Sequence, residues 1–573
     1  MKYIKIIPSI VLMFLCIELH AISPESASGW LVKPLIYGEH AMVVTNNPYA
    51  SETALSILKK GGNAVDAAIA AAFVLGLTEP QSSGIGGGGY ALSYHHASQG
   101  LTVYNGREQA PHSTKPQLFL NNNKQPLPLV KAMLSPKSIG VPGEVALLYT
   151  LHKEEGRMPW KQLVMPAIHL AKNGFSMSPR LYGMLKEEKD ILIKNPDIQA
   201  VYFDKDEVRP IGSPIKNSKY AQSLRKIAAD PQSFYTGKLA SDIIDTINQR
   251  AGKPLFSMED FSRYKVRIEK PLCAPFRSYT LCTTGGESGG LTLLELLGVY
   301  EQNYEGKSSK KTEWIYHFLE ASKLAYADRN LYNADPTFTA EVHEHILTPQ
   351  YIKKRAIQVN TLALKTPVKA GLLKNFKISK GSDESVKAPG TTSLTIVDSE
   401  GNAISTTITI EQKFGSHLFV DGFFLNNQLT DFSFKAVDAQ GNLIANRPQA
   451  YKRPRSAISP TLVFDKKHQL IALTGSPGGG NIICYVAKSL IFMLDFNKNP
   501  KESAAAGNLC SDNVQTIIEK NSSLSPAISA LKQKGESIKS VEMVSGTTNI
   551  KAGPKKGWYG AADPRRAGVA LGN

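Results

Sequence analysis

The chain has 573 residues, of which 42% are hydrophobic and 20% are charged, a balance typical of folded globular proteins and not of disordered ones. Its formal net charge of +17 is scattered, with basic clusters as short as residues 353–355, so we expect no nucleic-acid-binding module and no nucleic-acid partner. This length allows one very large domain or two to four ordinary ones.

The N-terminal segment has the features of a cleaved export signal. Lysines at positions 2 and 5 precede an apolar run over residues 6–16, and the small Ala21 precedes a polar stretch. The apolar run is too short to span a bilayer. We therefore expect residues 1–21 to be removed, and the mature protein to be periplasmic in a Gram-negative cell or secreted, without a stable membrane anchor.

Four cysteines remain once the signal is removed. Cys273 and Cys282 flank a predicted hairpin turn, so a disulfide between them is one of two alternatives, the other being two free thiols. Cys484 falls in a predicted apolar helix, where we expect no more than a buried side chain. No spacing of cysteines and histidines is typical of a metal site, and we expect no metal.

A buried helix and a glycine-rich turn come early in the mature chain. Residues 64–77 predict a helix that begins after an Asn63 cap, and alanine or glycine on every face indicates close packing. Residues 84–89 read GIGGGG, which formally matches the GxGxxG pattern of dinucleotide sites. That fingerprint follows a strand and opens a helix, whereas here it follows a helix and leads into strand-like residues 90–94. We therefore reject the dinucleotide interpretation.

The next segment is mainly helical in pattern. Residues 102–104 predict a second strand, and residues 130–380 are largely helical, with the clearest amphipathic segments at 163–171 and 314–329. Residues 377–387 lack periodicity and predict an exposed, mobile linker.

Beyond this linker, two pairs of strands and an apolar helix are expected. Residues 392–397 and 403–410 alternate around a turn that contains Gly401 and Asn402, residues 461–464 and 470–474 form a second pair, and a helix follows from about 481 to 494. Strands from both halves of the chain, flanked by helices, predict one α/β unit in which distant residues share a sheet.

The first of these strands begins with a chemically distinctive sequence. Residues 387–393 read KAPGTTS, so Thr391 directly follows Gly390. A Thr in this position can become a new N-terminus and use its own amine as the base that activates its hydroxyl. The simpler interpretation is a strand that begins with two threonines, because β-branched residues favour strands. This motif alone does not choose between the two.

Seven motifs are distributed over nearly the whole mature chain: the helix and glycine-rich turn at 61–90, NGRE at 105–108, AYADR at 325–329, GTT at 390–392, LNNQ at 425–428, KRPRS at 452–456 and GSPGG at 475–479. In this order they resemble the gamma-glutamyltransferase (gamma-glutamyltranspeptidase) family. The resemblance implies an α/β fold, the four-layer αββα sandwich of the N-terminal nucleophile hydrolases, with a helical extension from the large subunit. It also implies a precursor cut between Gly390 and Thr391 into a large subunit, residues 22–390, and a small subunit, residues 391–573, which both contribute to one catalytic unit.

The chemistry of the cut can be stated for these two residues. The Thr391 hydroxyl attacks the Gly390 carbonyl, an N-to-O shift gives an ester, and water hydrolyses it. Gly390 leaves this carbonyl unshielded and tolerates the strained backbone that the attack needs. The freed amine of Thr391, with a reference pKa of roughly 8, can then accept the hydroxyl proton near neutral pH.

The resemblance also implies two further catalytic roles. Thr409, on the neighbouring predicted strand, matches the family's second Thr, which orients the nucleophile by a hydrogen bond; an ordinary strand Thr is the alternative. Gly478 and Gly479 match the family's oxyanion hole. Paired amides at the start of a helix suit a developing negative oxygen on physical grounds as well.

Further matches concern a gamma-glutamyl substrate. Arg107 matches the family's clamp for the α-carboxylate, although Arg107 beside Glu108 would otherwise be interpreted as a surface ion pair. Ser456 matches one of two serines that assist this clamp. Gln428 and Asp431 match residues that hold the α-ammonium.

Three departures from the family pattern affect this pocket. Position 457 is Ala where the family commonly has its second Ser, which removes a hydrogen bond to a charged group, typically about 1.5–3 kcal/mol. Glu411 stands where bacterial members often carry Asn, so it attracts the ammonium more strongly and repels the carboxylate. Residues 432–451 occupy the region of the family's lid loop without its usual aromatic tip, which indicates a more open cleft.

The leading hypothesis is therefore an exported gamma-glutamyltransferase and glutathione hydrolase that forms a gamma-glutamyl ester on Thr391. Its donors would be glutathione and other gamma-glutamyl compounds, and its acceptors water, amino acids or dipeptides. A related amidase of the glutaryl type is the first alternative, because Ala457 and Glu411 alter the pocket. An uncut, non-catalytic exported binding protein is the second. No organic cofactor is expected, since the chain supplies the nucleophile, the base and the oxyanion donors.

Overall fold

The computed structural model describes residues 29–306, 312–373, 381–383, 390–554 and 556–573. The predicted export signal and most of the predicted linker lie outside these ranges. Within them, no helix combines the length and the apolar character needed to cross a membrane.

Two seven-stranded sheets form the centre of the molecule, and neighbouring strands in both run antiparallel. Sheet A has the order β1 (Ile36–Gly38), β22 (Trp558–Ala562), β21 (Thr548–Ala552), β17 (Leu470–Thr474), β16 (Thr461–Phe464), β11 (Tyr279–Thr283) and β10 (Leu272–Phe276). Sheet B has the order β23 (Val569–Gly572), β2 (Met42–Thr45), β12 (Thr392–Val397), β13 (Ala403–Thr409), β3 (Gly88–His95), β4 (Gly100–Gly106) and β9 (Arg267–Glu269).

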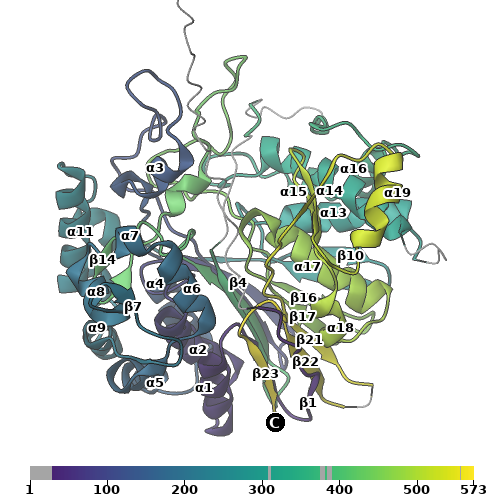
Figure 1. The fold of residues 1–573 in the computed structure, drawn as a ribbon. Helices are drawn as coiled ribbons and strands as arrows, with labels where there is room; N and C mark the ends of the chain where they lie inside the picture. Colours follow the sequence, from purple (N-terminus) through teal and green to yellow (C-terminus); the bar gives the residue numbers. More distant parts are fainter. Residues whose placement is uncertain (1–28, 307–311, 374–380, 384–389, 555) are drawn as a thin grey trace, which may run out of the picture.

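Helices cover the outer faces of both sheets, so the molecule has four layers (Figure 1). Apolar side chains fill the space between the sheets, among them Met42, Leu92, Leu462 and Leu473. Sheet B is covered by α1 (Pro48–Lys59), α2 (Ala64–Thr78) and α4 (Glu144–Glu155), with α5 (Trp160–Asn173) packed on α2. Sheet A is covered by α13 (Gly290–Asn303), α17 (Ile482–Leu490) and α18 (Pro500–Ala505), with α14 (Glu313–Tyr332) packed on α13. The predicted αββα arrangement is confirmed.

A helical extension lies outside the layer that covers sheet B, on the left of Figure 1. It contains α6 (Pro179–Glu187), α7 (Lys189–Leu192), α8 (Pro196–Tyr202), α9 (Ser218–Ala229), α10 (Ser233–Thr236), α11 (Lys238–Ala251) and α12 (Met258–Ser262). Its α9 packs on α5, which joins the extension to the core.

Smaller elements complete the described chain. They are the helices α3 (Leu129–Met133), α15 (His343–Ile346), α16 (Pro349–Ala356) and α19 (Ile528–Gln533), the sheet of β18 (Leu509–Ser511), β19 (Thr516–Glu519) and β20 (Ile538–Val541), and the pairs β5 (Phe175–Ser176) with β8 (Pro214–Ile215), β6 (Phe203–Asp204) with β7 (Glu207–Val208) and β14 (Phe419–Val420) with β15 (Phe423–Phe424). Short helical turns are η1 (Pro136–Ser138), η2 (Gln428–Asp431), η3 (Gly479–Asn481), η4 (Ile491–Asp495) and η5 (Ser525–Ala527).

The central hairpin, from the second half of the chain, shares a sheet with strands from the first half, as predicted. The strands β12 and β13 pair with Val397 opposite Ala403, and the hairpin lies between β2 and β3. Behind it, α2 begins at a capping box in which the Asn63 side chain accepts from the Asp66 amide and the Asp66 carboxylate accepts from the Asn63 amide. Every residue of α2 is buried, which the small side chains on all its faces permit.

The cysteines form two disulfides. One joins Cys273 and Cys282, which lie opposite each other on β10 and β11, so the bridged alternative is confirmed. The other joins Cys484 on α17 to Cys510 on β18. The prediction that Cys484 is merely buried was therefore wrong, because no local pattern brings β18 next to α17.

Of the three linker residues that the structure describes, Ser382 is exposed as predicted, but the prediction was wrong for Gly381 and Asp383, which are buried. Gly381 forms an isolated bridge with Ile444, and Asp383 is 1% exposed. The Asp383 carboxylate accepts from Arg455 Nη2 at 2.9 Å and from the Asn446 amide at 3.0 Å. A buried carboxylate of this kind needs such partners, and both come from residues far along the chain.

Two glycines test how tightly the layers pack. A Cβ on Gly86 would lie 2.1 Å from the Phe424 carbonyl oxygen, so Gly86→Ala should lower the free energy of unfolding by about 1–3 kcal/mol. Gly183 lies in α6 with open space where a Cβ would be. Gly183→Ala should therefore raise the free energy of unfolding by about 0.5–1 kcal/mol. Denaturant or thermal unfolding of the two variants measures both effects. Equal stability of the two variants would contradict this packing.

Candidate active site

Two threonine hydroxyls meet at one carbonyl at the open end of the central hairpin. Thr391 directly precedes β12, and Thr409 is the last residue of β13. The Thr391 hydroxyl donates to the Gly390 carbonyl oxygen at 2.6 Å and lies 3.3 Å from Thr409 Oγ1. The Thr409 hydroxyl donates to the same carbonyl and accepts from the Glu411 amide at 2.8 Å. The arrangement can polarise the Gly390 carbonyl next to a potential nucleophile.

Gly390 itself has no room for a side chain. A Cβ at this position would lie 2.2 Å from the Glu411 carbonyl oxygen, a backbone atom of the segment after β13. Only glycine therefore allows this close approach, which brings the carbonyl within reach of both hydroxyls.

A buried cluster of charged and amide groups is built from three distant segments. Arg107 follows β4, Gln428 and Asp431 lie on η2, and Glu411 follows β13. Arg107 Nη2 donates to Asp431 Oδ2 at 2.5 Å. The Gln428 amide donates to Glu411 Oε2 at 2.5 Å and to Asp431 Oδ2 at 3.0 Å. The structure thus brings four of the predicted substrate-binding residues together.

Arg107 is held firmly in its charged form. Burial alone would lower the pKa of Arg107, but the carboxylates of Asp431 and Glu108 outweigh burial and raise this pKa above its ordinary value. Its guanidinium also donates to the carbonyls of Pro454 and Arg455, at 3.2 and 2.9 Å. These contacts fix a planar cation of the kind that binds carboxylates bidentately.

Ser456 lies next to this cluster without joining it. Its hydroxyl accepts from the Ile458 amide at 3.1 Å, and its own amide donates to the Glu287 carbonyl. The neighbouring Arg455 carbonyl is the group that contacts Arg107. The lid region, residues 432–451, is tied to the cluster by Asn446, whose amide donates to the Asp431 carbonyl at 2.8 Å.

The Gly478–Gly479 pair lies in the loop between β17 and α17. Both residues have left-handed backbone angles, with φ of +135° and +57°, that side chains disfavour. A Cβ on Gly478 would also lie 2.4 Å from the Tyr485 ring. At the start of the same loop, a Cβ on Gly475 would lie 2.5 Å from the Ser393 hydroxyl oxygen, so this part of the loop packs against β12.

Comparisons with known proteins show which protein family this chain resembles. Residues 50–573 match the family model described as gamma-glutamyltranspeptidase. The chain is 30% identical over 564 residues to the glutathione hydrolase proenzyme of Bacillus subtilis strain 168, covering 94% of this chain and 92% of that protein. It is also 30% identical over 545 residues to the glutathione hydrolase proenzyme of Escherichia coli K12, covering 92% and 91%.

The chain belongs to the gamma-glutamyltranspeptidase family. Its structure resembles a cephalosporin acylase from Bacillus halodurans with a TM-score of 0.82 and 25% identity, over 94% of this chain and 97% of that one. It resembles the Helicobacter pylori gamma-glutamyltranspeptidase with a TM-score of 0.52 and 29% identity, over 58% and 94%. The fold is therefore that of the N-terminal nucleophile hydrolases, as the motifs predicted.

Two residues that the sequence did not single out hold the start of β12 in this family member. Arg566, between β22 and β23, donates from Nη1 to the Thr391 carbonyl at 2.9 Å. Asn46, directly after β2, accepts from the Ser393 amide at 2.7 Å and donates to the Gly546 carbonyl at 2.8 Å. Both act on backbone atoms from distant segments, so no motif marks them beyond the tandem arginines at 565–566.

The residues of this candidate site are buried in the structure. The exposed fraction is between 1% and 9% for each of four residues: Arg107, Thr391, Asp431 and Glu411. Arg107 and Asp431 also bind each other, which occupies both groups.

Glu108 is the titratable group of the site with the clearest consequence for stability. Its carboxylate is fully buried, and burial raises the pKa of Glu108 to about 7, against the opposing effect of Arg107, whose Nη1 lies 3.7 Å away. A carboxyl whose pKa is raised by folding stabilises the fold fully below its ordinary pKa of 4.5. This contribution is lost as the pH rises through about 7.

The wild-type protein should therefore lose stability relative to Glu108→Gln between pH 5 and pH 7. The expected change is at most about 1.4 kcal/mol per pH unit in the free energy of unfolding. Unfolding of both proteins at pH 5, 6 and 7 measures it, with the exposed Glu52→Gln as a matched control. A difference that stays constant with pH would contradict the raised pKa of the buried Glu108.

Proposed function

We propose that this chain is an autoprocessed gamma-glutamyltransferase and glutathione hydrolase. The observation that carries the proposal is the convergence of the Thr391 and Thr409 hydroxyls on the Gly390 carbonyl in a member of this family. The Bacillus subtilis and Escherichia coli relatives are named proenzymes, which supports a chain that is cut before it acts.

The first reaction is the cut. Thr391 Oγ1 adds to the Gly390 carbonyl carbon while the Thr409 hydroxyl draws electron density toward the carbonyl oxygen. The bond from Gly390 to the Thr391 nitrogen breaks, the nitrogen takes up the hydroxyl proton, and an ester remains. Water hydrolyses this ester to a carboxylate on Gly390 and a free hydroxyl on Thr391. The products, residues 22–390 and 391–573, stay together because β12 and β13 lie between β2 and β3.

The second reaction uses the new N-terminus. The Thr391 amine takes the proton from its own hydroxyl, which attacks the gamma-glutamyl carbonyl, while the amides of Gly478 and Gly479 stabilise the negative oxygen. The bond to the leaving amine breaks, and that amine receives the proton from the Thr391 ammonium. The gamma-glutamyl ester then passes to water, which gives glutamate, or to the amino group of an amino acid or dipeptide.

The buried cluster fits the two charges of a gamma-glutamyl group. Arg107, assisted by Ser456, binds the α-carboxylate, and Asp431, Gln428 and Glu411 bind the α-ammonium. The substrate replaces the contact between Arg107 and Asp431 with one partner for each. Glutathione is the expected donor, and the predicted export signal places the reaction in the periplasm or outside the cell.

The cut is tested by changing the nucleophile. The wild-type protein should separate into two fragments on denaturing electrophoresis, and N-terminal sequencing of the smaller one should begin at Thr391. Thr391→Ala should remain one chain without activity, because it lacks the attacking oxygen. Thr391→Ser keeps that oxygen and should still be cut. An uncut wild-type protein, or a Thr391→Ala variant that is cut at the same bond, would refute the mechanism.

A glutaryl amidase is the second candidate function. It is favoured by the similarity to the cephalosporin acylase over 94% of this chain, and by Ala457, which lacks the hydroxyl that commonly supports the carboxylate clamp. A glutaryl group has no α-ammonium, so it gains nothing from a carboxylate at Asp431. The presence of Asp431 and Glu411 in the cluster therefore supports the gamma-glutamyl function.

Turnover of gamma-glutamyl and glutaryl anilides separates the two functions. We expect the wild-type enzyme to prefer the gamma-glutamyl anilide. Asp431→Asn should lower kcat/KM for this substrate about 10- to 100-fold, the value of a hydrogen bond to a charged group, and should affect the glutaryl anilide much less. Asp438→Asn makes the same chemical change in the lid region and should leave the ratio unaltered. A wild-type preference for the glutaryl anilide would overturn the first function.

A further inference from the structure

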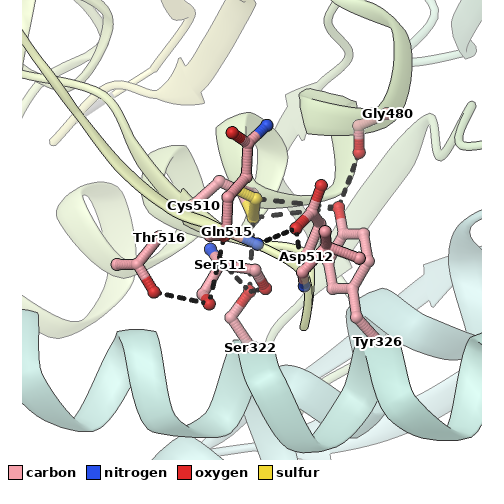
Figure 2. Close-up of a disulfide and its surroundings, with 10 residues drawn as sticks. Ser322, Tyr326, Gly480, Cys510, Ser511, Asp512, Gln515 and Thr516 are labelled. Atoms are coloured by element: carbon pink, nitrogen blue, oxygen red, sulfur yellow. Dashed lines mark hydrogen bonds between the residues drawn. A yellow bond between two sulfur atoms is a disulfide. The ribbon is translucent and has the colours of Figure 1, made fainter. Parts of the chain in front are cut away.

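The carbonyl next to the Gly478–Gly479 pair is held by a residue from another layer of the fold. The Tyr326 hydroxyl, on α14, donates to the Gly480 carbonyl oxygen at 2.6 Å (Figure 2). Tyr326 is 5% exposed, so its ring is packed and its hydroxyl direction is set by its surroundings.

The same hydroxyl touches the disulfide between Cys484 and Cys510. Its oxygen lies 3.8 Å from both sulfur atoms, and the two cysteines are 0% and 1% exposed. Cys484 lies in the first turn of α17, which directly follows the loop, and Cys510 lies on β18. The disulfide therefore fixes the helix start that ends the loop.

One turn earlier on α14, a second side chain reaches the same place. The Ser322 hydroxyl donates to the Ser511 carbonyl at 2.7 Å and lies 3.5 Å from Cys484 Sγ (Figure 2). The helix α14 thus contacts the strand side and the helix side of the disulfide. Tyr326, the disulfide and α14 form one contiguous unit, which we call the loop brace.

The last part of the loop needs support of this kind because it has little packing of its own. Gly479 and Gly480 are partly exposed, and apart from the adjoining residues no heavy atom lies within 4 Å of where a Gly480 Cβ would be. Three consecutive glycines also lose more backbone entropy on ordering than other residues. The Tyr485 ring holds Gly478 from one side, so the brace supplies the support at the other end of the glycine run.

We propose that the loop brace positions the amides of Gly478 and Gly479 for the transition state. Tyr326 and the two cysteines are positioning residues, because they act through the Gly480 carbonyl and the start of α17. Since the proposal depends on the function proposed above, its readout is kcat for gamma-glutamyl hydrolysis. Misdirected amides weaken transition-state binding more than substrate binding, so kcat should respond more than KM.

Tyr326→Phe is the direct test, because it removes the donor and keeps the ring. We expect kcat for a gamma-glutamyl anilide to fall about five- to tenfold, with KM changed less than twofold. Electrophoresis confirms that the variant is cut, and rates are expressed per cut molecule. A Tyr326→Phe enzyme with wild-type kcat would overturn the proposal, whatever its melting temperature.

The disulfide between Cys273 and Cys282 provides a matched control for the one between Cys484 and Cys510. Cys484→Ser/Cys510→Ser should lower kcat about as much as Tyr326→Phe, and combining them should add little, because both remove the same support. Cys273→Ser/Cys282→Ser removes a disulfide at the edge of sheet A and should leave kcat within twofold of wild type. Equal loss of kcat in both pairs would show a general loss of stability and would overturn the brace. If the Cys484 pair does not fold, Tyr326→Phe alone decides.

The two proposals fail in different ways. A wild-type protein without gamma-glutamyl turnover would refute the proposed function, and the brace with it. An active wild-type enzyme with an unchanged Tyr326→Phe variant would refute the brace alone.

Discussion

The close approach of Gly390 to the segment after β13 organises everything else at this site. Gly390 has no Cβ, and a Cβ there would collide with the Glu411 carbonyl oxygen. The absence of a side chain therefore lets the bond before Thr391 lie directly against the segment that follows Thr409. Both hydroxyls then reach one carbonyl. The hairpin that presents them lies in the middle of sheet B, with β2 and β3 on its two sides. Reactive groups on the ends of central strands are held more rigidly than groups on surface loops.

Burial of this site requires that its charges be paired. An isolated buried ion is strongly unfavourable, and removing one partner of a buried pair is costly. Arg107 therefore has Asp431 beside it, and the neighbouring Arg455 has Asp383. A zwitterionic amino-acid group brings one charge of each sign. It would give Arg107 and Asp431 one oppositely charged partner each, whereas a substrate with a carboxylate alone would supply a charged partner only for Arg107. This pairing is a physical reason for the proposed preference for zwitterionic gamma-glutamyl groups over simple anions.

The sequence predicted the parts of the fold that local patterns encode. Alternation placed β12, β13, β16 and β17, the Asn63 cap placed the start of α2, and the order of the motifs indicated the four layers. It also named the residues that meet at the charged cluster. It did not reveal Arg566 or Asn46, which bind backbone atoms of a strand far from them in sequence.

The same reason explains the two wrong predictions. Polar composition near residue 383 indicated a linker, but Arg455 and Asn446 make its carboxylate a buried group. An apolar helix around Cys484 indicated a buried thiol, but β18 brings Cys510 to it. In each case the deciding partner comes from another element, and no period or motif records which elements become neighbours. Local sequence gives the elements, and packing decides these contacts.

The two halves of the candidate site are supported by different layers. Thr391 is held from sheet B, through its own strand and through Asn46 after β2, whereas the Gly478–Gly479 loop leaves sheet A and is held by α14, α17 and β18. The proposed nucleophile and the proposed oxyanion donors therefore keep their relative position only as well as the two sheets keep theirs. The tightly buried interface between the sheets, with Leu92 and Leu473 among its fully buried residues, fixes that position. Packing between the two sheets thus sets how precisely the two halves of the proposed site can be aligned.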